Sequence, residues 1–339
     1  MNKQLNCRIE FWAVILAIFL SGCNEELPIL APGNPVPVVY SFVNPADTIH
    51  YIKLGRSFCG NETFSKMARD SSLLFFANPQ VALEIVTDIG WPVKYASFSK
   101  SIGPEKEPGV FLESPNLLYK FNGQLQTYLA DGYTMRLIIS IPDEKIYCSA
   151  SQIYYAPPEL LLPTASHHTM KMNLYYGEPI QIKWEDKYGY SAYQIAIIFN
   201  YQDFYDNDSL FTSAKVLFNH DGHVSSPDQK TSTLIQILHG DTFLRLLGKS
   251  IEDNVNVLYR KFQSFDIVLT AASPSYRDYR DSYNIASDRL GRPVSNVADG
   301  LGLFALISET KHEGYLLDKP SIDSLCSGRF TKQLGFVKW

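Results

Sequence analysis

The sequence predicts a mainly β protein with two β-sandwich-like domains, of the immunoglobulin or transthyretin kind, and one or two short helices. Three observations predict this class. The 339-residue chain contains 21 Tyr and 20 Phe, and aromatic residues favour strands. Only 19% of the residues are charged, which is typical of a β-rich protein outside the cytoplasm. Short stretches that alternate between apolar and polar residues are separated by polar turns.

The first domain is expected to span residues 38–156. Within residues 49–58, His50, Ile52 and Leu54 form an apolar face, and the opposite face, which includes Lys53, is mixed. Asn122-Gly123 predicts a hairpin-type turn. The expected strands are 38–43, 49–58, 81–86, 133–141 and 145–155, and residues 62–70 form the one plausible helix here.

Three prolines between residues 156 and 165 predict a junction, so the second domain is expected to span residues 165–339. A helix is expected over residues 241–251, because Asp241 can cap it and an apolar face follows. The expected strands are 179–186, 191–204, 262–273 and 302–308.

The first 22 residues have the features of a secretory signal peptide. Lys3 and Arg8 supply positive charge, and residues 11–20 are wholly apolar. This apolar run is shorter than the roughly 20 residues of a membrane-spanning helix. Residues 23–37 are rich in proline and predict a flexible tether.

Leu20-Ser21-Gly22-Cys23 resembles the bacterial lipobox, in which the cysteine is acylated and becomes the new N-terminus. The resemblance implies that Cys23 is the lipid attachment residue and carries palmitate-type chains; an ordinary signal peptide with a chance cysteine is the alternative. Glu25 and Glu26 resemble the acidic signal that sends Bacteroidota lipoproteins to the cell surface, although they also suit a solvated tether. We therefore expect a lipid-anchored protein of the outer membrane, displayed on the cell surface.

Charge and cysteine content narrow the possible partners. The formal net charge is −5, and removal of residues 1–22 makes it about −6, which argues against binding nucleic acid or an anionic lipid surface. Cys59, Cys148 and Cys326 remain in the mature chain and match no metal or redox spacing. Buried free thiols are the favoured interpretation, and a single disulfide between two of them stays open.

Several segments together resemble a known family. They are "DTIHYIKLGRSF" (47–58), "VALEIV" (81–86), "YTMRLIISIPD" (133–143), "ASQIYYAPPEL" (150–160) and "RPVSNVADGLGLFA" (292–305). They are similar to an uncharacterised family of Bacteroidota outer-membrane lipoproteins, the DUF4249-like domain of unknown function. The resemblance implies a β-rich lipoprotein linked with TonB-dependent transport across the outer membrane, and it implies no catalytic residues.

Two clusters of acidic or histidine residues could bind a metal ion, but each has a simpler interpretation. His220, Asp221 and His223 lack a third or fourth ligand nearby, since the distant pair His167-His168 is a poor chelate, and Asp-Gly favours a turn. The segment 203–208 is rich in Asp, but its spacing departs from the EF-hand, so a solvated loop is favoured. We expect no metal.

Residues 296–304 contain two glycines of a possible nucleotide motif. The third glycine of G-x-G-x-x-G is missing, and a strand is expected to follow. A turn that leads into the last strand is therefore favoured, and we expect no cofactor.

The segment SYRDYRDSY (275–283) is the strongest candidate for a binding surface. Tyr276, Arg277, Tyr279 and Arg280 could stack on sugars or bases. Asp278 and Asp281 nearly cancel the positive charge, which disfavours nucleic acid. The alternative is a helical turn or loop with local ion pairs and its tyrosines packed beneath.

Three short patterns resemble the Asp-Ser/Thr-apolar acceptor site of Bacteroidota protein O-glycosylation. The candidate residues are Thr48, Ser209 and Ser324. Ordinary strand or turn chemistry also explains each of them.

No G-x-S-x-G or H-E-x-x-H motif occurs, so the chain is expected not to be an enzyme. The leading hypothesis is a non-enzymatic lipoprotein that binds a ligand or partner, as an accessory of a TonB-dependent outer-membrane barrel. Two alternatives are a surface glycan hydrolase, which needs two close carboxylates in a deep pocket, and a structural or adhesive protein, which a long exposed edge strand would support.

Overall fold

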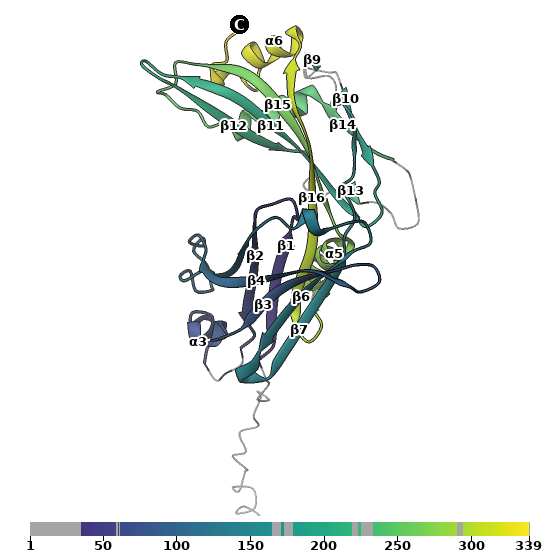
Figure 1. Ribbon diagram of the computed structural model, residues 1–339. Helices are drawn as coiled ribbons and strands as arrows, with labels where there is room; N and C mark the ends of the chain where they lie inside the picture. The colour runs from purple at the N-terminus through teal and green to yellow at the C-terminus, as the bar shows by residue number, and fades with distance from the viewer. Residues whose placement is uncertain are drawn as a thin grey trace, which may run out of the picture.

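The computed structural model describes residues 35–58, 60, 62–164, 171–172, 179–218, 223–224, 233–289 and 294–338. Within these residues the protein is mainly β, as the sequence predicts. A 13-stranded sheet and a separate three-stranded sheet form the framework, and short helices cover parts of it (Figure 1). None of the helices in the described ranges combines the length and apolar character needed to span a bilayer.

The buried apolar side chains form two separate cores, and we call the elements around each core a lobe. The first lobe contains β1 (Pro37–Val43), β2 (Ile49–Arg56), α2 (Phe64–Met67), α3 (Ser71–Leu74), β3 (Gln80–Val86), β4 (Pro92–Ile102), β5 (Leu117–Asn122), η1 (Gln126–Tyr128), β6 (Thr134–Ile141), η2 (Pro142–Glu144) and β7 (Ile146–Ile153). It also includes the start of β16 (Leu301–Leu317), and α5 (Pro274–Arg289) lies against it.

The second lobe contains the remaining elements. They are β8 (Leu160–Leu162), β9 (Lys171–Met172), β10 (Pro179–Glu185), β11 (Ala192–Phe204), β12 (Ser209–Leu217), β13 (His223–Val224), β14 (Thr233–His239), α4 (Gly240–Ser250), β15 (Tyr259–Ala272), α6 (Lys319–Ser327) and η3 (Lys332–Leu334). Its core brings together Trp184 of β10, Phe199 of β11, Phe265 of β15 and Phe243 of α4. Burial of each such large side chain contributes about 1.5–3 kcal/mol.

The first lobe is a sheet that folds back on itself. Its strands run in the order β16-β1-β2-β5-β4-β3-β6-β7. The two ends of this path meet, because the backbones of Ser149 in β7 and Ala298 just before β16 exchange hydrogen bonds of 3.2 and 2.7 Å. The result is a sandwich-like wrap around the first core. Ile52 and Leu54 of β2 point inward, as the alternation in residues 49–58 predicts.

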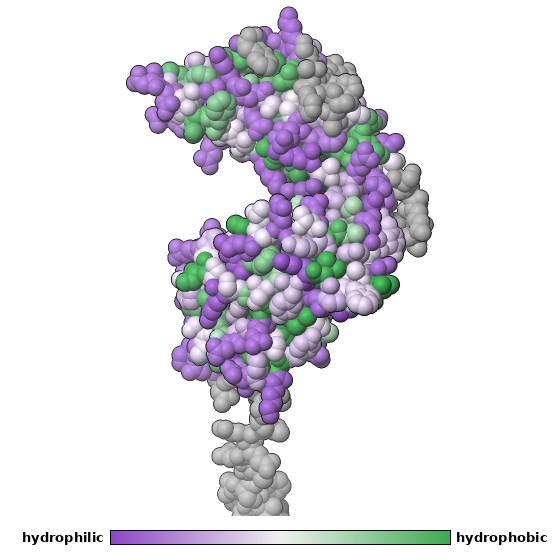
Figure 2. Space-filling view, in the orientation of Figure 1, coloured by the Kyte–Doolittle hydropathy of each residue, from purple (hydrophilic) through white to green (hydrophobic). Residues whose placement is uncertain are grey.

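Strand β16 belongs to both lobes. Its residues from Leu301 to Leu306 pair in parallel with β1, and those from Ile307 to Tyr315 pair antiparallel with β15. Figure 1 shows this strand running from the lower lobe into the upper one, and Figure 2 shows a hollow between the two lobes beside it. Phe304 and Leu306 therefore fill the first core although they lie late in the chain.

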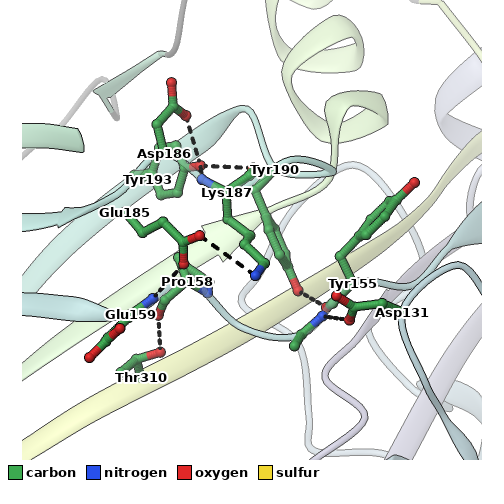
Figure 3. A network of polar contacts seen from close by, with 11 residues as sticks. Asp131, Tyr155, Pro158, Glu159, Glu185, Asp186, Lys187, Tyr190, Tyr193 and Thr310 are labelled. Atoms are coloured by element: carbon green, nitrogen blue, oxygen red, sulfur yellow. Dashed lines mark hydrogen bonds and ion pairs between the residues drawn. The ribbon is translucent and has the colours of Figure 1, made fainter. Parts of the chain in front are cut away.

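The segment between the lobes is fixed by polar contacts to both of them (Figure 3). The Asp131 carboxylate accepts a 2.6 Å hydrogen bond from the backbone N–H of Ala156. On the other side, the Tyr190 hydroxyl donates to the Tyr155 carbonyl at 2.7 Å, and the Thr310 hydroxyl donates to the Pro158 carbonyl at 2.6 Å. These contacts satisfy backbone groups of the linker and hold it against neighbouring strands.

Some local expectations are wrong. The chain turns after Asn122, but the next residues form η1, and β5 pairs with β2 and β4, so no hairpin forms there. Asp241 does not cap α4: the N-cap residue is His239, and it makes no side-chain cap hydrogen bond. Asp241 lies in the first turn, where its carboxylate still favours the positive end of the helix dipole.

Candidate functional site

A pocket opens on the outer face of β1 and β2 in the first lobe. Because side chains alternate along a strand, the residues between those that fill the core face outward. On this outer face the register places Tyr40 beside Lys53 and Val38 beside Gly55. A Cβ at Gly55 would meet Val38 and Leu74 at 3.8–4.0 Å, which is ordinary van der Waals contact, so a methyl group fits there and a larger side chain would fill the space. Gly55 therefore forms the floor of the pocket.

Two segments rise above this floor. Leu74 at the end of α3 and the adjacent Phe75 form one wall, and residues 106–111 of the loop between β4 and β5 form the other. The pocket has a volume of about 610 Å³. That size lies within the range of roughly 300–1,000 Å³ that is usual for small-molecule sites.

Lys53 is the most informative polar group in the pocket. Its ammonium donates a 2.6 Å hydrogen bond to the Asn116 side-chain oxygen and lies 5.8 Å from the centre of the Phe75 ring. Burial, with a smaller contribution from the charge of Lys106, lowers the pKa of Lys53 to about 8. Among the described residues no carboxylate forms an ion pair with Lys53, so its charge has no opposite partner.

The other charged groups of the pocket differ from Lys53. Arg56 already forms a 2.8 Å ion pair with Glu144, and its guanidinium lies over the Phe76 ring at 5.3 Å. Lys106 and Glu107 stand side by side in the loop wall. Since Glu144 offsets Arg56, one positive charge remains in excess, and we assign it to the half-buried Lys53.

Aromatic rings also gather past the end of β2, in addition to Phe75 beside Lys53. Phe58 lies 5.7 Å from Phe64, and Phe64 lies 5.9 Å from Phe111, measured between ring centres. Phe64 and Phe111 are each about half exposed. Next to this end the first described residues join β2, because Val36 and Ser57 exchange hydrogen bonds of 2.8 and 2.9 Å. The pocket is therefore cationic at one end and aromatic at the end where the described chain begins.

The lowered pKa of Lys53 predicts a specific dependence of stability on pH. Between pH 8 and the usual lysine pKa of 10.5, the unfolded chain keeps a proton at Lys53 that the folded chain has released. The free energy of unfolding therefore rises with pH in this window. We expect urea unfolding to show that wild type gains stability relative to Lys53→Met between pH 7 and pH 9.5. The control is Lys100→Met, at an exposed lysine of β4, and wild type should not gain stability relative to this variant over the same pH range. If wild type gains equally relative to both variants, the lowered pKa does not belong to Lys53.

The candidate surface of residues 275–283 lies on α5, a helix longer than the single turn expected. Two of its tyrosines pack on the outer face of β1: the Tyr276 ring lies 5.9 Å from Phe42, and the Tyr279 hydroxyl lies 3.1 Å from the Tyr40 hydroxyl. Tyr40 also lines the pocket, so this surface adjoins it.

The two arginines of this candidate surface form ion pairs with the acidic residues that follow them. Arg277 contacts Asp278 at 3.1 Å, and Arg280 contacts Asp281 at 3.0 Å. The contacts match the local packing named as the alternative, although they join adjacent residues. A role for this surface in binding stays a prediction.

The three glycosylation candidates lie in different settings. Thr48 is exposed just before β2. Ser209 begins β12 and accepts a 2.7 Å hydrogen bond from Gln202, whereas Ser324 lies half-buried within α6. Their modification stays a prediction, and Thr48 is the most accessible of the three.

The metal candidates do not assemble among the described residues. Asp203 is buried and bound to Arg260 at 2.7 Å, so it is not a calcium ligand. Within the described ranges no group of three or more His, Cys, Asp and Glu residues could hold a metal. The structure does not describe four of the candidates, which are His167, His168, His220 and Asp221. It describes the backbone of His223 but not its side chain.

The cysteines are structural where they are described. Cys148 is a free thiol in the first core, and burial raises its pKa to about 11, which makes it unreactive. Cys326 is also free. Cys59 and the expected lipid attachment residue Cys23 lie outside the described residues, as do Glu25 and Glu26.

The glycine-containing segment 296–304 forms the favoured turn into a strand. Asp299 adopts a left-handed conformation with φ of 55°, and β16 starts at Leu301. The Asn296 side chain accepts a hydrogen bond from the Phe304 N–H at 2.9 Å and donates one to the Phe304 carbonyl at 2.6 Å. These residues close the first lobe and form no phosphate-binding loop.

Sequence reasoning did not find the pocket. Lys53 was visible as a polar residue on the mixed face of its strand, with Gly55 two positions later on the same face. That spacing indicates a position without a side chain next to a lysine on the same face of the strand. The walls come from α3 and from a loop about fifty residues away, and nothing in the local pattern shows that they fold over this patch.

No family model and no curated protein matches this chain. The resemblance to the DUF4249-like lipoproteins therefore stays a prediction from the segments quoted above.

Proposed function

We propose that this protein is an outer-membrane lipoprotein, anchored through Cys23 at the cell surface, that binds a ligand or partner without catalysing a reaction. We propose further that it serves a TonB-dependent outer-membrane barrel as an accessory. The observation that carries the proposal is the pocket at Lys53, a small-molecule-sized cavity with an apolar lining and few polar groups. Such cavities are the usual form of ligand sites.

The carboxylates of the pocket support binding over hydrolysis. Glycoside hydrolysis uses a pair of carboxyl groups roughly 5–10 Å apart. Among the described residues one carboxylate, Glu107, lines this pocket, and Glu144 nearby forms an ion pair with Arg56. A single exposed carboxylate beside two lysines suits recognition of charge better than paired acid and base catalysis.

The position of the pocket supports an anchored binding protein. Val36, two residues into the described chain, is bonded to Ser57 at the aromatic end of the pocket. A lipid on Cys23 would therefore hold this end of the first lobe within a short tether of the membrane. The second lobe would point away from the membrane, where a partner could reach it.

One observation favours a structural or adhesive role as a second candidate. Among the described strands, β12 pairs with β11 alone and ends the sheet. Its outer positions include the exposed Leu210 and Phe211. Unpaired backbone groups on an edge strand can recruit another strand.

Extraction of the outer membrane with mild detergent tests the proposal. The chain carries a tag after Trp339, and the proteins that co-purify are identified by mass spectrometry. We expect an outer-membrane barrel in stoichiometric amount. The variant Cys23→Ala should lose both the acyl mass at the N-terminus and the barrel. Recovery of a single lipidated chain without a barrel would refute the accessory role, and recovery as multimers of itself would favour the adhesive one.

A further inference from the structure

We propose that the Lys53 pocket binds an amphipathic monocarboxylate of the fatty-acid type. Its carboxylate would contact Lys53, and its apolar body would lie over Gly55 toward Phe58 and Phe111. This inference names the ligand class of the proposed binding function and rests on it.

The polar end of the pocket suits a carboxylate. A lysine ammonium has three N–H donors, and the described contacts use one of them, toward Asn116. The remaining donors have no carboxylate partner among the described residues. Hydrogen bonds between an ammonium and a carboxylate are among the strong ones, especially where burial limits competition by water.

The charge balance favours a single negative charge. Lys53 and Lys106 carry two positive charges, Glu107 carries one negative charge, and Glu144 offsets Arg56. A monoanion would neutralise the pocket. A dianion would bring a surplus negative charge beside Glu107, and a cation would face Lys53 directly.

The rest of the pocket suits an apolar chain. From Lys53 to Ser57 the floor follows β2 for four residue steps, or about 13 Å at roughly 3.3 Å per residue. Val38 and Gly55 lie along this path. Phe58 and Phe111 line the pocket, and the Phe64 ring contacts both of them. A ligand that is polar at one end alone matches this arrangement, whereas a sugar would place hydroxyl groups against aromatic and aliphatic walls.

The exposed aromatic rings indicate the direction of entry. Phe64 and Phe111 are 55% and 52% exposed although they contact each other. They stand at the end of the pocket that carries the first described residues. In an anchored protein this end would face the membrane, so an amphiphile could enter from the lipid surface.

Calorimetric titration of residues 24–339, the mature chain without its lipid, tests the ligand class. Decanoate is the probe, with decanol and decyltrimethylammonium as neutral and cationic comparators of equal chain length. We expect one decanoate site per chain, with binding at least about tenfold tighter than for either comparator, because decanol carries no charge to pair with Lys53 and the ammonium head group would be repelled by it.

Two pocket variants and their controls make the result specific. Lys53→Met should weaken decanoate binding about tenfold or more and leave decanol unchanged, whereas Lys100→Met, outside the pocket, should change neither. In Gly55→Leu the leucine side chain should occupy the space above the pocket floor and abolish binding of decanoate and of decanol. Gly55→Ala should retain binding, since its Cβ fits at 3.8–4.0 Å.

Several outcomes would overturn the proposal. They are the absence of decanoate binding, equal binding of all three probes, or retention of wild-type affinity in Lys53→Met. If Gly55→Leu does not fold, the Lys53→Met comparison still decides the matter. The titration needs no membrane, so its failure would refute the ligand class alone, while the detergent extraction decides the anchor and the partner separately.

Discussion

Replacement of Gly302 by alanine is expected to prevent the chain from folding. Gly302 lies opposite Val39 in the parallel pair of β16 and β1, with φ of +111°, a value that side chains rarely tolerate. An added Cβ would overlap the Val39 carbonyl oxygen. This overlap involves backbone atoms, so it is relieved only if the two strands separate.

The expected loss of stability exceeds about 5 kcal/mol, which is comparable with the whole stability of many domains. Soluble yield and urea unfolding measure it. Gly314→Ala is the matched control: Gly314 also lies in β16 with positive φ, at +80°, but nothing lies within 4 Å of the added Cβ. It should lose about 1–3 kcal/mol for backbone strain alone. Equal stability of the two variants would show that β1 and β16 do not approach as described.

Removal of the Arg260 side chain is expected to have the second largest effect. The Arg260 guanidinium is 3% exposed and contacts Asp203 at 2.7 Å. It also donates to the carbonyl of Leu334 at 2.7 Å and to that of Glu252 at 3.1 Å. These hydrogen bonds attach the C-terminal segment and the loop after α4 to the first residues of β15.

Arg260→Ala leaves the Asp203 carboxylate buried without a partner and frees two carbonyl groups. Loss of one partner of a buried pair costs about 3–5 kcal/mol, and urea unfolding should show a decrease of that size. Arg136→Ala is the control, because its pair with Glu84 is half exposed at 3.6 Å and contributes about 0–1 kcal/mol. The double variant Asp203→Ala/Arg260→Met removes both charges of the pair. If it is as unstable as Arg260→Ala, the unpaired Asp203 carboxylate does not cause the loss of stability.

The sequence predicted the elements that show one clear periodicity. The structure confirms the strands expected at 49–58, 81–86 and 133–141 as β2, β3 and β6. β2 and β6 alternate between buried and more exposed positions, whereas β3 is buried at almost every position. β4 and β12 were not predicted because each has only two buried positions, Ala96 and Phe98 in β4 and Ala214 and Val216 in β12. Such residues give a weak alternating signal even where the strand is well paired.

Long-range pairing explains what the sequence did not predict. β1 and β16 are joined residue by residue although some 260 positions separate them, and no local pattern indicates a parallel partner at that distance. As a result β16 extends through both lobes, far beyond the segment 302–308 that was expected. The pocket has the same origin, because its floor is one strand pair and its walls are distant segments.

We propose that this protein binds its ligand in the Lys53 pocket. The most direct test is to purify the tagged chain from its own membranes, extract it with organic solvent and identify the non-covalent small molecules by mass spectrometry. We expect an anionic amphiphile at close to one molecule per chain in wild type, less in Lys53→Met and none in Gly55→Leu. The same molecules in the same amounts from wild type and Gly55→Leu would contradict the claim.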